Sequence, residues 1–297
     1  MRLATRGSAL ALAQARWVAG ELERLGEETE LVVVTTSGDE RESGPVVSDD
    51  KSRFVKEIED ALLDGRADLA VHSAKDVPAE LPDGLALVGV PARADARDAL
   101  CGAASLGELP DGAVVGTASL RRRAQLLAAR PDLDVRDLRG NVDTRLRRLA
   151  DGDFDAIVLA QAGLARLGRE AEGNPIDPVA MVPAAGQGCL ALEGRRGGAE
   201  ADVAAALTDR AALVRLTAER ALVSALGATC RTPVAAHAEI EGDGLRLTAF
   251  AGMPDGGLWI RDEAEGDAGD PAALGDLVAQ RMAAAGAAEL LEAAERS

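Results

Sequence analysis

Residues Asp68–Asp76 have the sequence D-L-A-V-H-S-A-K-D, in which a short apolar run is followed at once by polar residues. The apolar part, Leu69–Val71, predicts a buried strand. Ligands and chemistry in open α/β sheets lie at the carboxyl ends of strands, and Lys75 and Asp76 follow this one. An ammonium group there would hold an anion, and a carboxylate would stabilise a cation or move a proton. The alternative is an ordinary solvent-exposed ion pair in a turn.

Short apolar runs alternate with helical patterns on both sides of this stretch, from Leu3–Thr5 to Asp155–Leu159. Such alternation predicts parallel sheets. After Cys230 the pattern changes to alternating apolar and polar residues with glycine turns, which predicts an antiparallel sheet. A single alanine-rich helix is expected over about 271–294. The predicted class is therefore α/β, with a small α+β part at the C-terminal end.

Composition narrows the function classes. The 297 residues suggest two or three domains, and 47% hydrophobic with 28% charged residues is typical of a globular protein. A net charge of −17 argues against nonspecific nucleic-acid binding. We find no apolar run of membrane-spanning length and no signal-peptide pattern, so a cytoplasmic protein is expected. Three widely spaced cysteines form neither a disulfide framework nor a metal-ligand pattern.

Positive charge is concentrated in one region despite the acidic total. Residues 121–148 contain nine arginines against four aspartates. Four predicted strand ends lead through Gly, Ser, Thr or Asn into a helix with arginine nearby, at Arg6–Ser8, Thr117–Arg122, Arg139–Arg145 and Gln161–Arg166. Free N–H groups at helix N-termini and guanidinium groups both bind carboxylates. Ordinary capping explains any single junction, but the set indicates a small anionic ligand.

The few lysines and cysteines of the chain add further candidate site residues. The chain has only three lysines, of which Lys51 and Lys75 are predicted site residues and Lys56 a helix-surface residue. Cys230 lies in a turn-like segment beside Arg231, where it is either a reactive thiolate or a small buried side chain. Cys101 and Cys189 are expected to be structural.

Taken together, these stretches resemble the porphobilinogen deaminase (hydroxymethylbilane synthase) family. The matching segments occur in the family's order and span essentially the whole chain. They are Ala4-Thr5-Arg6-x-Ser8, Phe54-Val55-Lys56-Glu57, Ala70-Val71-His72-Ser73-x-Lys75-Asp76-Val77-Pro78, Val115-Gly116-Thr117-x-Ser119-Leu120-Arg121-Arg122, Leu138-Arg139-Gly140-Asn141-Val142-x-Thr144-Arg145, Gly163-Leu164-x-Arg166-Leu167-Gly168, Pro183-Ala184-x-Gly186-Gln187-Gly188 and the loop with Cys230.

The resemblance implies a transferase of haem and porphyrin biosynthesis that joins four porphobilinogen molecules head to tail, with loss of ammonia, to give the linear tetrapyrrole hydroxymethylbilane. The chain grows on a covalent dipyrromethane cofactor, and no metal is implied. It also implies two periplasmic-binding-protein-like α/β domains facing a cleft and a small third domain. The implied boundaries are 1–92 with 189–208, then 96–184, then 211–297. A monomer with no nucleic-acid or membrane partner is expected.

The resemblance also implies roles for individual residues. Asp76 is the implied catalytic carboxylate, opposite the pyrrole N–H of an electron-poor azafulvenium-type intermediate, and Cys230 is the implied thioether anchor. The other implied cofactor-binding residues are Lys75, Ser119, Arg121, Arg122, Arg139, Arg145 and Gly188. The implied substrate-binding residues are Arg6, Ser8, Lys51, Phe54, Arg166 and Gln187.

The sequence departs from the family pattern in three places: Ala118 stands where Ser is frequent, Ser37–Asp50 has no lysine, and Ala228-Thr229 precedes Cys230 in place of a glycine pair. Two alternatives therefore stay open. One is a noncatalytic two-lobed binding protein for a small carboxylate ligand, in which Cys230 is merely packed. The other is a catalytically impaired paralogue.

Overall fold

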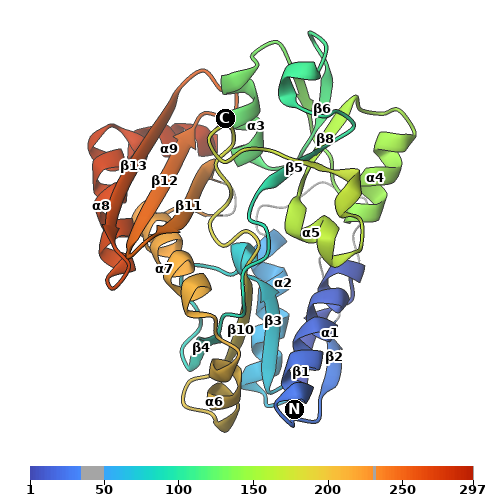
Figure 1. Cartoon of the computed structure of the whole chain (residues 1–297), viewed down its shortest axis with the longest axis vertical. Helices are drawn as coiled ribbons and strands as arrows, with labels where there is room; N and C mark the ends of the chain where they lie inside the picture. The colour runs from blue at the N-terminus through green and yellow to red at the C-terminus, as the bar shows by residue number, and fades with distance from the viewer. Residues whose placement is uncertain (35–49, 230–231, 297) are drawn as a thin grey trace. The chain divides into compact units, whose positions relative to one another are not determined.

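The computed structural model describes residues 1–34, 50–229 and 232–296, and only the backbone of residues 50–54 (Figure 1). The described chain packs as two compact units. The first unit comprises Met1–Arg93 and Cys189–Leu213, and the second comprises Ala94–Gly188 and Val214–Ser297. The predicted separation of 96–184 from 211–297 as two further domains stays a prediction.

The first unit is built on a five-stranded sheet with the order β2-β1-β3-β10-β4. Its strands are β1 (Arg2–Arg6), β2 (Glu30–Val34), β3 (Leu69–Ser73), β4 (Leu85–Gly89) and β10 (Leu190–Arg195). β1 pairs in parallel with β2 and β3, whereas β10 is antiparallel to both of its neighbours. The predicted parallel pairing is therefore confirmed for β1 with β2 and β3, whereas the sequence predicts no direction for β10. The chain returns to this strand from the second unit, so no local β-α-β crossover fixes its direction.

Helices cover both faces of this sheet, α1 (Ala9–Arg24) on one and α2 (Asp50–Leu63) on the other (Figure 1). α1 packs Val18 and Leu22 against Leu69 and the rest of that face. Alternate residues of a strand point to opposite faces, so Ala70 belongs to the other core. Burial on both faces explains the apolar runs Leu69–Val71 and Leu190–Leu192 in the central strands. The short helix α6 (Ala199–Ala206) follows β10.

The second unit contains a five-stranded sheet with the order β7-β6-β8-β5-β9. Its strands are β5 (Asp98–Cys101), β6 (Val114–Gly116), β7 (Asp134–Arg136), β8 (Ala156–Ala160) and β9 (Asn174–Pro175), and its helices are α3 (Leu120–Ala129), α4 (Val142–Ala150) and α5 (Gln161–Arg166). β6 is parallel to β7 and β8, but β5 is antiparallel to β8. The sequence analysis missed β5, because four residues beginning with an aspartate give little apolar signal.

The second unit also contains the predicted antiparallel sheet, formed by β11 (Val234–Glu241), β12 (Gly244–Gly252) and β13 (Trp259–Asp267) in that order. Part of α7 (Arg210–Ala225) and the helices α8 (Pro271–Ala284) and α9 (Ala287–Arg296) complete its core. The prediction of one final helix is wrong. Gly286 has a φ of +97° and separates α8 from α9, a left-handed conformation that glycine adopts readily at helix ends.

The fold class predicted from the sequence is confirmed in its elements: two α/β sheets and a small antiparallel sheet with helices. Across the described ranges, no helix is both long and apolar enough to cross a membrane.

Candidate active site

The Lys75–Asp76 pair lies on a single 3-10 turn, Ala74–Asp76, which directly follows β3 near the middle of the first sheet. Both side chains are half-buried. The amide of Ala74 donates to the carbonyl of Cys189 at 3.0 Å, and the Gln14 amide on α1 donates to Ser73 Oγ at 2.9 Å. The turn is thus tied to β10 on one side and to α1 on the other. An ammonium group and a carboxylate are held together where a strand meets solvent.

Arg6 and Ser8 lie at the same edge of this sheet. β1 and β3 are parallel, with Ala4 opposite Ala70, so Arg6 and the Ala74–Asp76 turn lie at neighbouring strand ends. Ser8 is the N-cap of α1, and its Oγ accepts from the amide of Ala11 at 3.3 Å. The side chain of Ser8 therefore has a structural partner, as the capping alternative requires. Arg6, Ser8, Lys75 and Asp76 still converge on one edge.

Several predicted residues fall outside what the structure describes. The side chains of Lys51 and Phe54 lie outside the described residues, although their backbone forms the start of α2. Cys230 and nearly all of Ser37–Asp50 lie outside as well. Lys56, predicted to be a surface residue of the helix, is exposed. Cys101 and Cys189 are both buried, and their structural roles stay predictions.

Two of the predicted strand-to-helix junctions meet at one edge of the second sheet. β6 and β7 are parallel, and each leads through a cap into a helix. Ser119 caps α3 by accepting from the amide of Arg122 at 3.4 Å, and Asn141 caps α4 by accepting from the amide of Thr144 at 2.8 Å. These caps place two helix N-termini, and the arginines beside them, at one sheet edge. The positive ends of both helices favour anions there.

Arg121 and Arg122 have a shared internal partner that the sequence analysis did not find. Both are only 6% exposed, and both guanidinium groups face the fully buried carboxylate of Asp98. Arg121 donates to Asp98 Oδ2 at 2.7 Å, and Arg122 Nε donates to Oδ1 at 2.9 Å. Their remaining recorded hydrogen bonds go to the carbonyls of Val182 and Val158. The two positive charges thus share one carboxylate within the second unit, which leaves this cluster with a net charge of +1.

The electrostatics of this cluster follow from its burial. Burial opposes ionisation of Asp98, but the neighbouring charges of Arg121 and Arg122 outweigh it and hold the pKa of Asp98 well below its ordinary value. Burial in turn lowers the pKa of Arg122. A buried carboxylate with two guanidinium partners stays ionised and firmly bonded.

Arg139 and Arg145 differ from Arg121 and Arg122 in that their side chains are not fully buried. Arg139 is exposed, with Nη2 at 3.4 Å from Asp137, and half-buried Arg145 donates from Nε to the carbonyl of Gly140 at 2.7 Å. Much of the remaining positive region is neutralised locally, since Arg130 and Arg136 pair with Asp132 and Asp134, respectively. Arg139 and Arg145, near the start of α4, are therefore more accessible than Arg121 and Arg122.

The glycine-rich segment 183–188 is held from several sides. Gln187 is 1% exposed and donates to Asp98 Oδ1 at 3.0 Å, so it joins the same cluster as Arg121. Arg166 donates to the carbonyl of Gly188 at 2.8 Å. Gly188 has a φ of +86°, and a Cβ there would lie 2.5 Å from the carbonyl oxygen of Ala94. Only glycine fits this close approach of two backbone segments.

Glu219 is the second buried acid that the sequence analysis missed. It is fully buried on α7 and accepts from the amides of Gly186, at 2.7 Å, and Ala238, at 2.8 Å. It therefore ties the glycine-rich segment to β11. Neither acid has a clear signal in the sequence, since Asp98 follows Arg97 and Glu219 precedes Arg220. Their burial, which requires partners for a carboxylate, is evident only from the fold.

Comparisons with known proteins cover nearly the whole chain. The family profile described as "Porphobilinogen deaminase, dipyromethane cofactor binding domain" matches residues 1–205, and "Porphobilinogen deaminase, C-terminal domain" matches residues 213–284. A porphobilinogen deaminase of Deinococcus radiodurans is 48% identical over 299 residues, covering 97% of both chains. One from Thermus thermophilus is 49% identical over 294 residues, covering 97% of this chain and 96% of the relative.

Solved structures give weaker matches. A periplasmic substrate-binding protein of an ABC transporter from Coxiella burnetii is 16% identical, with a TM-score of 0.42, and the match covers 72% of this chain and 94% of that one.

Proposed function

The chain belongs to the porphobilinogen deaminase family, and from this premise we propose that Asp76 is its catalytic carboxylate. The family reaction joins four porphobilinogen molecules head to tail, releases ammonia from each, and yields hydroxymethylbilane. The observation that carries the proposal is the half-buried Lys75–Asp76 pair on one 3-10 turn at a strand end.

Charge complementarity supports separate roles for Lys75 and Asp76 in this turn. When the bond from the pyrrole methylene to its protonated amino group breaks, neutral ammonia leaves with the bonding electrons and the positive charge remains on the pyrrole. The carboxylate of Asp76 would stabilise that charge and hold the pyrrole N–H. The ammonium group of Lys75 would bind a carboxylate of the pyrrole side chains. Arg6 and Ser8 at the neighbouring strand end support substrate binding at the same edge.

The dipyrromethane cofactor carries acetate and propionate groups, so a fitting site needs several cationic and N–H donors. The second unit supplies them: the exposed Arg139, the half-buried Arg145 and the capped N-termini of α3 and α4. When bound, this group supplies the pyrrole on which the product chain is extended. We propose Arg139, Arg145 and Ser119 as its ligands in this unit, with Lys75 as a further ligand.

Arg121 and Arg122 are proposed to act first as supports. Their bonds to Asp98 hold the start of α3, and with it Ser119, at the sheet edge. Direct binding of cofactor carboxylates by Arg121 and Arg122 would need N–H groups beyond those given to Asp98 and the two carbonyls, and stays a prediction. Gln187 and Gly188 would contribute through the backbone segment that they hold in place.

The remaining assignments rest on the family resemblance. We propose Cys230 as the thioether anchor of the cofactor, and Lys51, Phe54 and Arg166 as substrate-binding residues. The protein is also proposed to act in the cytoplasm as a monomer, without nucleic-acid or membrane partners. The acidic net charge of −17 supports the absence of a nucleic-acid partner.

Incubation of the purified protein with porphobilinogen tests the proposal, with ammonia release, hydroxymethylbilane formation and intact mass as readouts. We expect turnover and a mass excess equal to two deaminated pyrrole units. The alternative, a noncatalytic binding protein, predicts binding without ammonia release or mass change. That result after incubation of the apoprotein would overturn the proposed function.

A further inference from the structure

Three ionisable side chains lie buried together between α2 and the first sheet. Glu59 on α2 and His72 on β3 are each 7% exposed, and Glu193 on β10 has no exposed surface. His72 pairs in register with Ala191, so Glu193, two residues further along β10, points to the same face of the sheet. α2 covers that face.

The surroundings of this cluster are apolar. The same face packs Ile58 and Leu62 of α2 against Ala70 and Leu85 of the sheet. Burying charges in such surroundings is costly unless they are paired or neutralised. Three titratable groups at one place therefore require an explanation beyond packing.

The recorded contacts leave the cluster short of hydrogen bonds. His72 Nε2 lies 3.0 Å from Glu193 Oε2. This contact is an ion pair only if His72 is protonated, and it is not a hydrogen bond. Within the described parts of the chain, His72 Nε2, both carboxylate oxygens of Glu193 and Glu59 Oε1 are buried and have no hydrogen-bond partner. Two carboxyl groups in this position are most easily satisfied when one of them keeps a proton and donates it to the other.

The charges around Glu59 favour that arrangement. Burial, followed by the charge of Glu193, raises the pKa of Glu59 to about 7, and Asp60 acts in the same direction. His72 from β3 and Lys56 from α2 oppose the shift. Glu59 is therefore the group that exchanges a proton near neutral pH.

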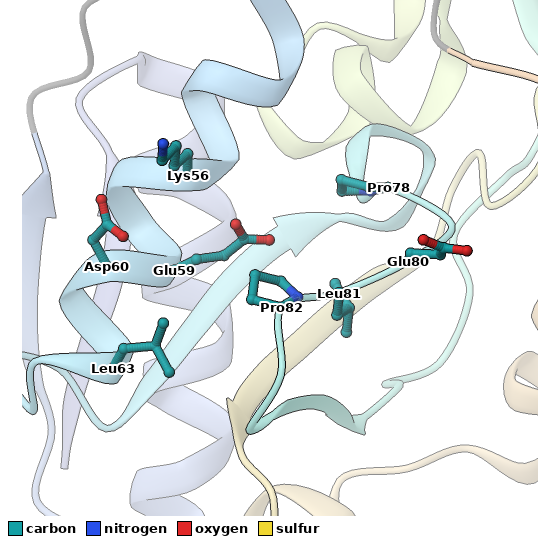
Figure 2. A pocket seen from close by; sticks show the side chains of 8 residues that line it. All are labelled: Lys56, Glu59, Asp60, Leu63, Pro78, Glu80, Leu81 and Pro82. Atoms are coloured by element: carbon teal, nitrogen blue, oxygen red, sulfur yellow. The ribbon is translucent and has the colours of Figure 1, made fainter.

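The carboxyl group of Glu59 lies near the segments that flank the Ala74–Asp76 turn. Figure 2 shows Glu59 extending from α2 toward the segment that carries Pro78 and Pro82. These residues line a surface pocket of about 500 Å³ together with Glu59, which gives water a route to the carboxyl group. His72 is the penultimate residue of β3, which leads directly into the Ala74–Asp76 turn, and Pro78 follows shortly after that turn. The cluster thus includes a residue of the strand before Lys75 and Asp76 and shares a pocket with the segment after them.

We propose that Glu59, His72 and Glu193 form one proton-holding cluster that docks α2 against the strand and segment flanking the Lys75–Asp76 turn, and so positions this turn for substrate. The proposal rests on the proposed function of that turn. With Glu59 protonated, its O–H donates to Glu193 and the three elements stay together. When Glu59 loses its proton, two carboxylates repel each other, the docking loosens and substrate affinity falls. Glu59, His72 and Glu193 are positioning residues, because none of them is proposed to contact substrate.

The decisive measurement is the pH dependence of KM and kcat for porphobilinogen in cofactor-loaded enzyme. We expect KM to rise at least threefold between pH 6 and 8 in the native enzyme. Glu59→Gln keeps a donor toward Glu193 but cannot ionise, so its KM should stay flat while kcat remains within twofold. Asp60→Asn is the matched control, since it makes the same carboxylate-to-amide change at an exposed position of α2. It should keep the rise in KM, displaced slightly to lower pH because Asp60 helps to raise the pKa of Glu59.

His72→Gln tests the direction in which the pKa of Glu59 shifts. Removing the imidazole removes a group that lowers the pKa of Glu59, so the rise in KM should move to higher pH. The proposal is overturned if the KM profile of Glu59→Gln coincides with the native one, or if Glu59→Gln changes kcat by the same factor at every pH. If Glu59→Gln does not fold, His72→Gln carries the kinetic test.

A readout without turnover separates this proposal from the proposed function. The side-chain carboxyl of Glu59 can be followed by carbon-13 NMR of glutamate-labelled protein, with the Glu59→Gln spectrum to assign it. Titration near 7 supports the cluster, and titration near the ordinary glutamate value of 4.5 overturns it. Native enzyme that titrates as expected but releases no ammonia would instead overturn the proposed function and leave the cluster intact.

Discussion

Arg121 donates two hydrogen bonds to the fully buried carboxylate of Asp98, from Nη1 at 2.7 Å and from Nη2 at 3.0 Å. Arg122 and Gln187 bond to the same carboxylate. One side chain at the start of β5 therefore holds the first turn of α3 and the glycine-rich segment together. The helix N-terminus proposed to face the cofactor depends on this single buried acid.

Replacing Asp98 should accordingly be among the single substitutions that lower the free energy of unfolding most. Asp98→Asn leaves two buried guanidinium groups without their counter-charge, and removal of one partner from a buried ion pair costs about 3–5 kcal/mol. Chemical denaturation measures this loss. Asp134→Asn is the control, because it breaks an exposed pair with Arg136 and should cost less than about 1 kcal/mol. Equal losses in the two variants would contradict the structural role of Asp98.

Asp76→Asn should abolish turnover while leaving the fold intact. The amide keeps the size of the side chain but loses the negative charge that the developing cation requires, and loss of such a group typically lowers kcat by about 10²–10³-fold or more. Ammonia release measures the effect, and circular dichroism with thermal unfolding verifies the fold. Near-normal kcat in a correctly folded variant would remove Asp76 from the catalytic role.

Cys230→Ser should prevent stable covalent attachment of the cofactor, because a hydroxyl group replaces the thiolate nucleophile. Intact mass after incubation with porphobilinogen should then equal that of the unmodified chain. The control is Cys101→Ser, at a buried cysteine proposed to be structural, which should keep the mass excess. A modified peptide elsewhere in Cys230→Ser would refute the anchor assignment.

Gly188→Ala should destabilise the protein through two separate effects. The positive φ of +86° is unfavourable for alanine, and the new Cβ would lie 2.5 Å from the carbonyl oxygen of Ala94. Gly152→Ala isolates the first effect, since Gly152 has a φ of +81° and open space around it. We expect the free energy of unfolding to fall by about 1 kcal/mol for Gly152→Ala and by at least twice that for Gly188→Ala. Equal costs would show that the contact with Ala94 relaxes freely.

Glu59→Gln should change how stability depends on pH. The pKa of Glu59 rises from its ordinary 4.5 to about 7 on folding, so between these values the folded protein binds more protons than the unfolded chain. Stability contributed by the protonated group is present below pH 4.5 and is lost as pH rises toward 7. Relative to the native protein, Glu59→Gln should therefore gain stability from pH 5 to 8. Parallel denaturation midpoints for the two proteins across this range would contradict the raised pKa.

Local sequence determined most of the elements and their order. Leu69–Val71 forms a buried strand because its residues are apolar on both faces, and Ser119 and Asn141 begin helices because their side chains accept from free amides. The pairing of Lys75 with Asp76 on one turn also followed from their positions in the sequence. Motifs such as these depend on neighbours within a few residues, so they are visible without the fold.

Only the tertiary structure decided which partners distant residues find. Asp98 meets Arg121 and Gln187, Glu219 meets the amide of Gly186, and His72 meets Glu193. The antiparallel directions of β5 and β10 likewise come from long-range pairing. A buried charge must find its partner wherever the fold brings one, and that partner is separated by 23 to 121 positions here. The sequence contains these acids, but only the packing of the sheets buries them and decides which groups they meet.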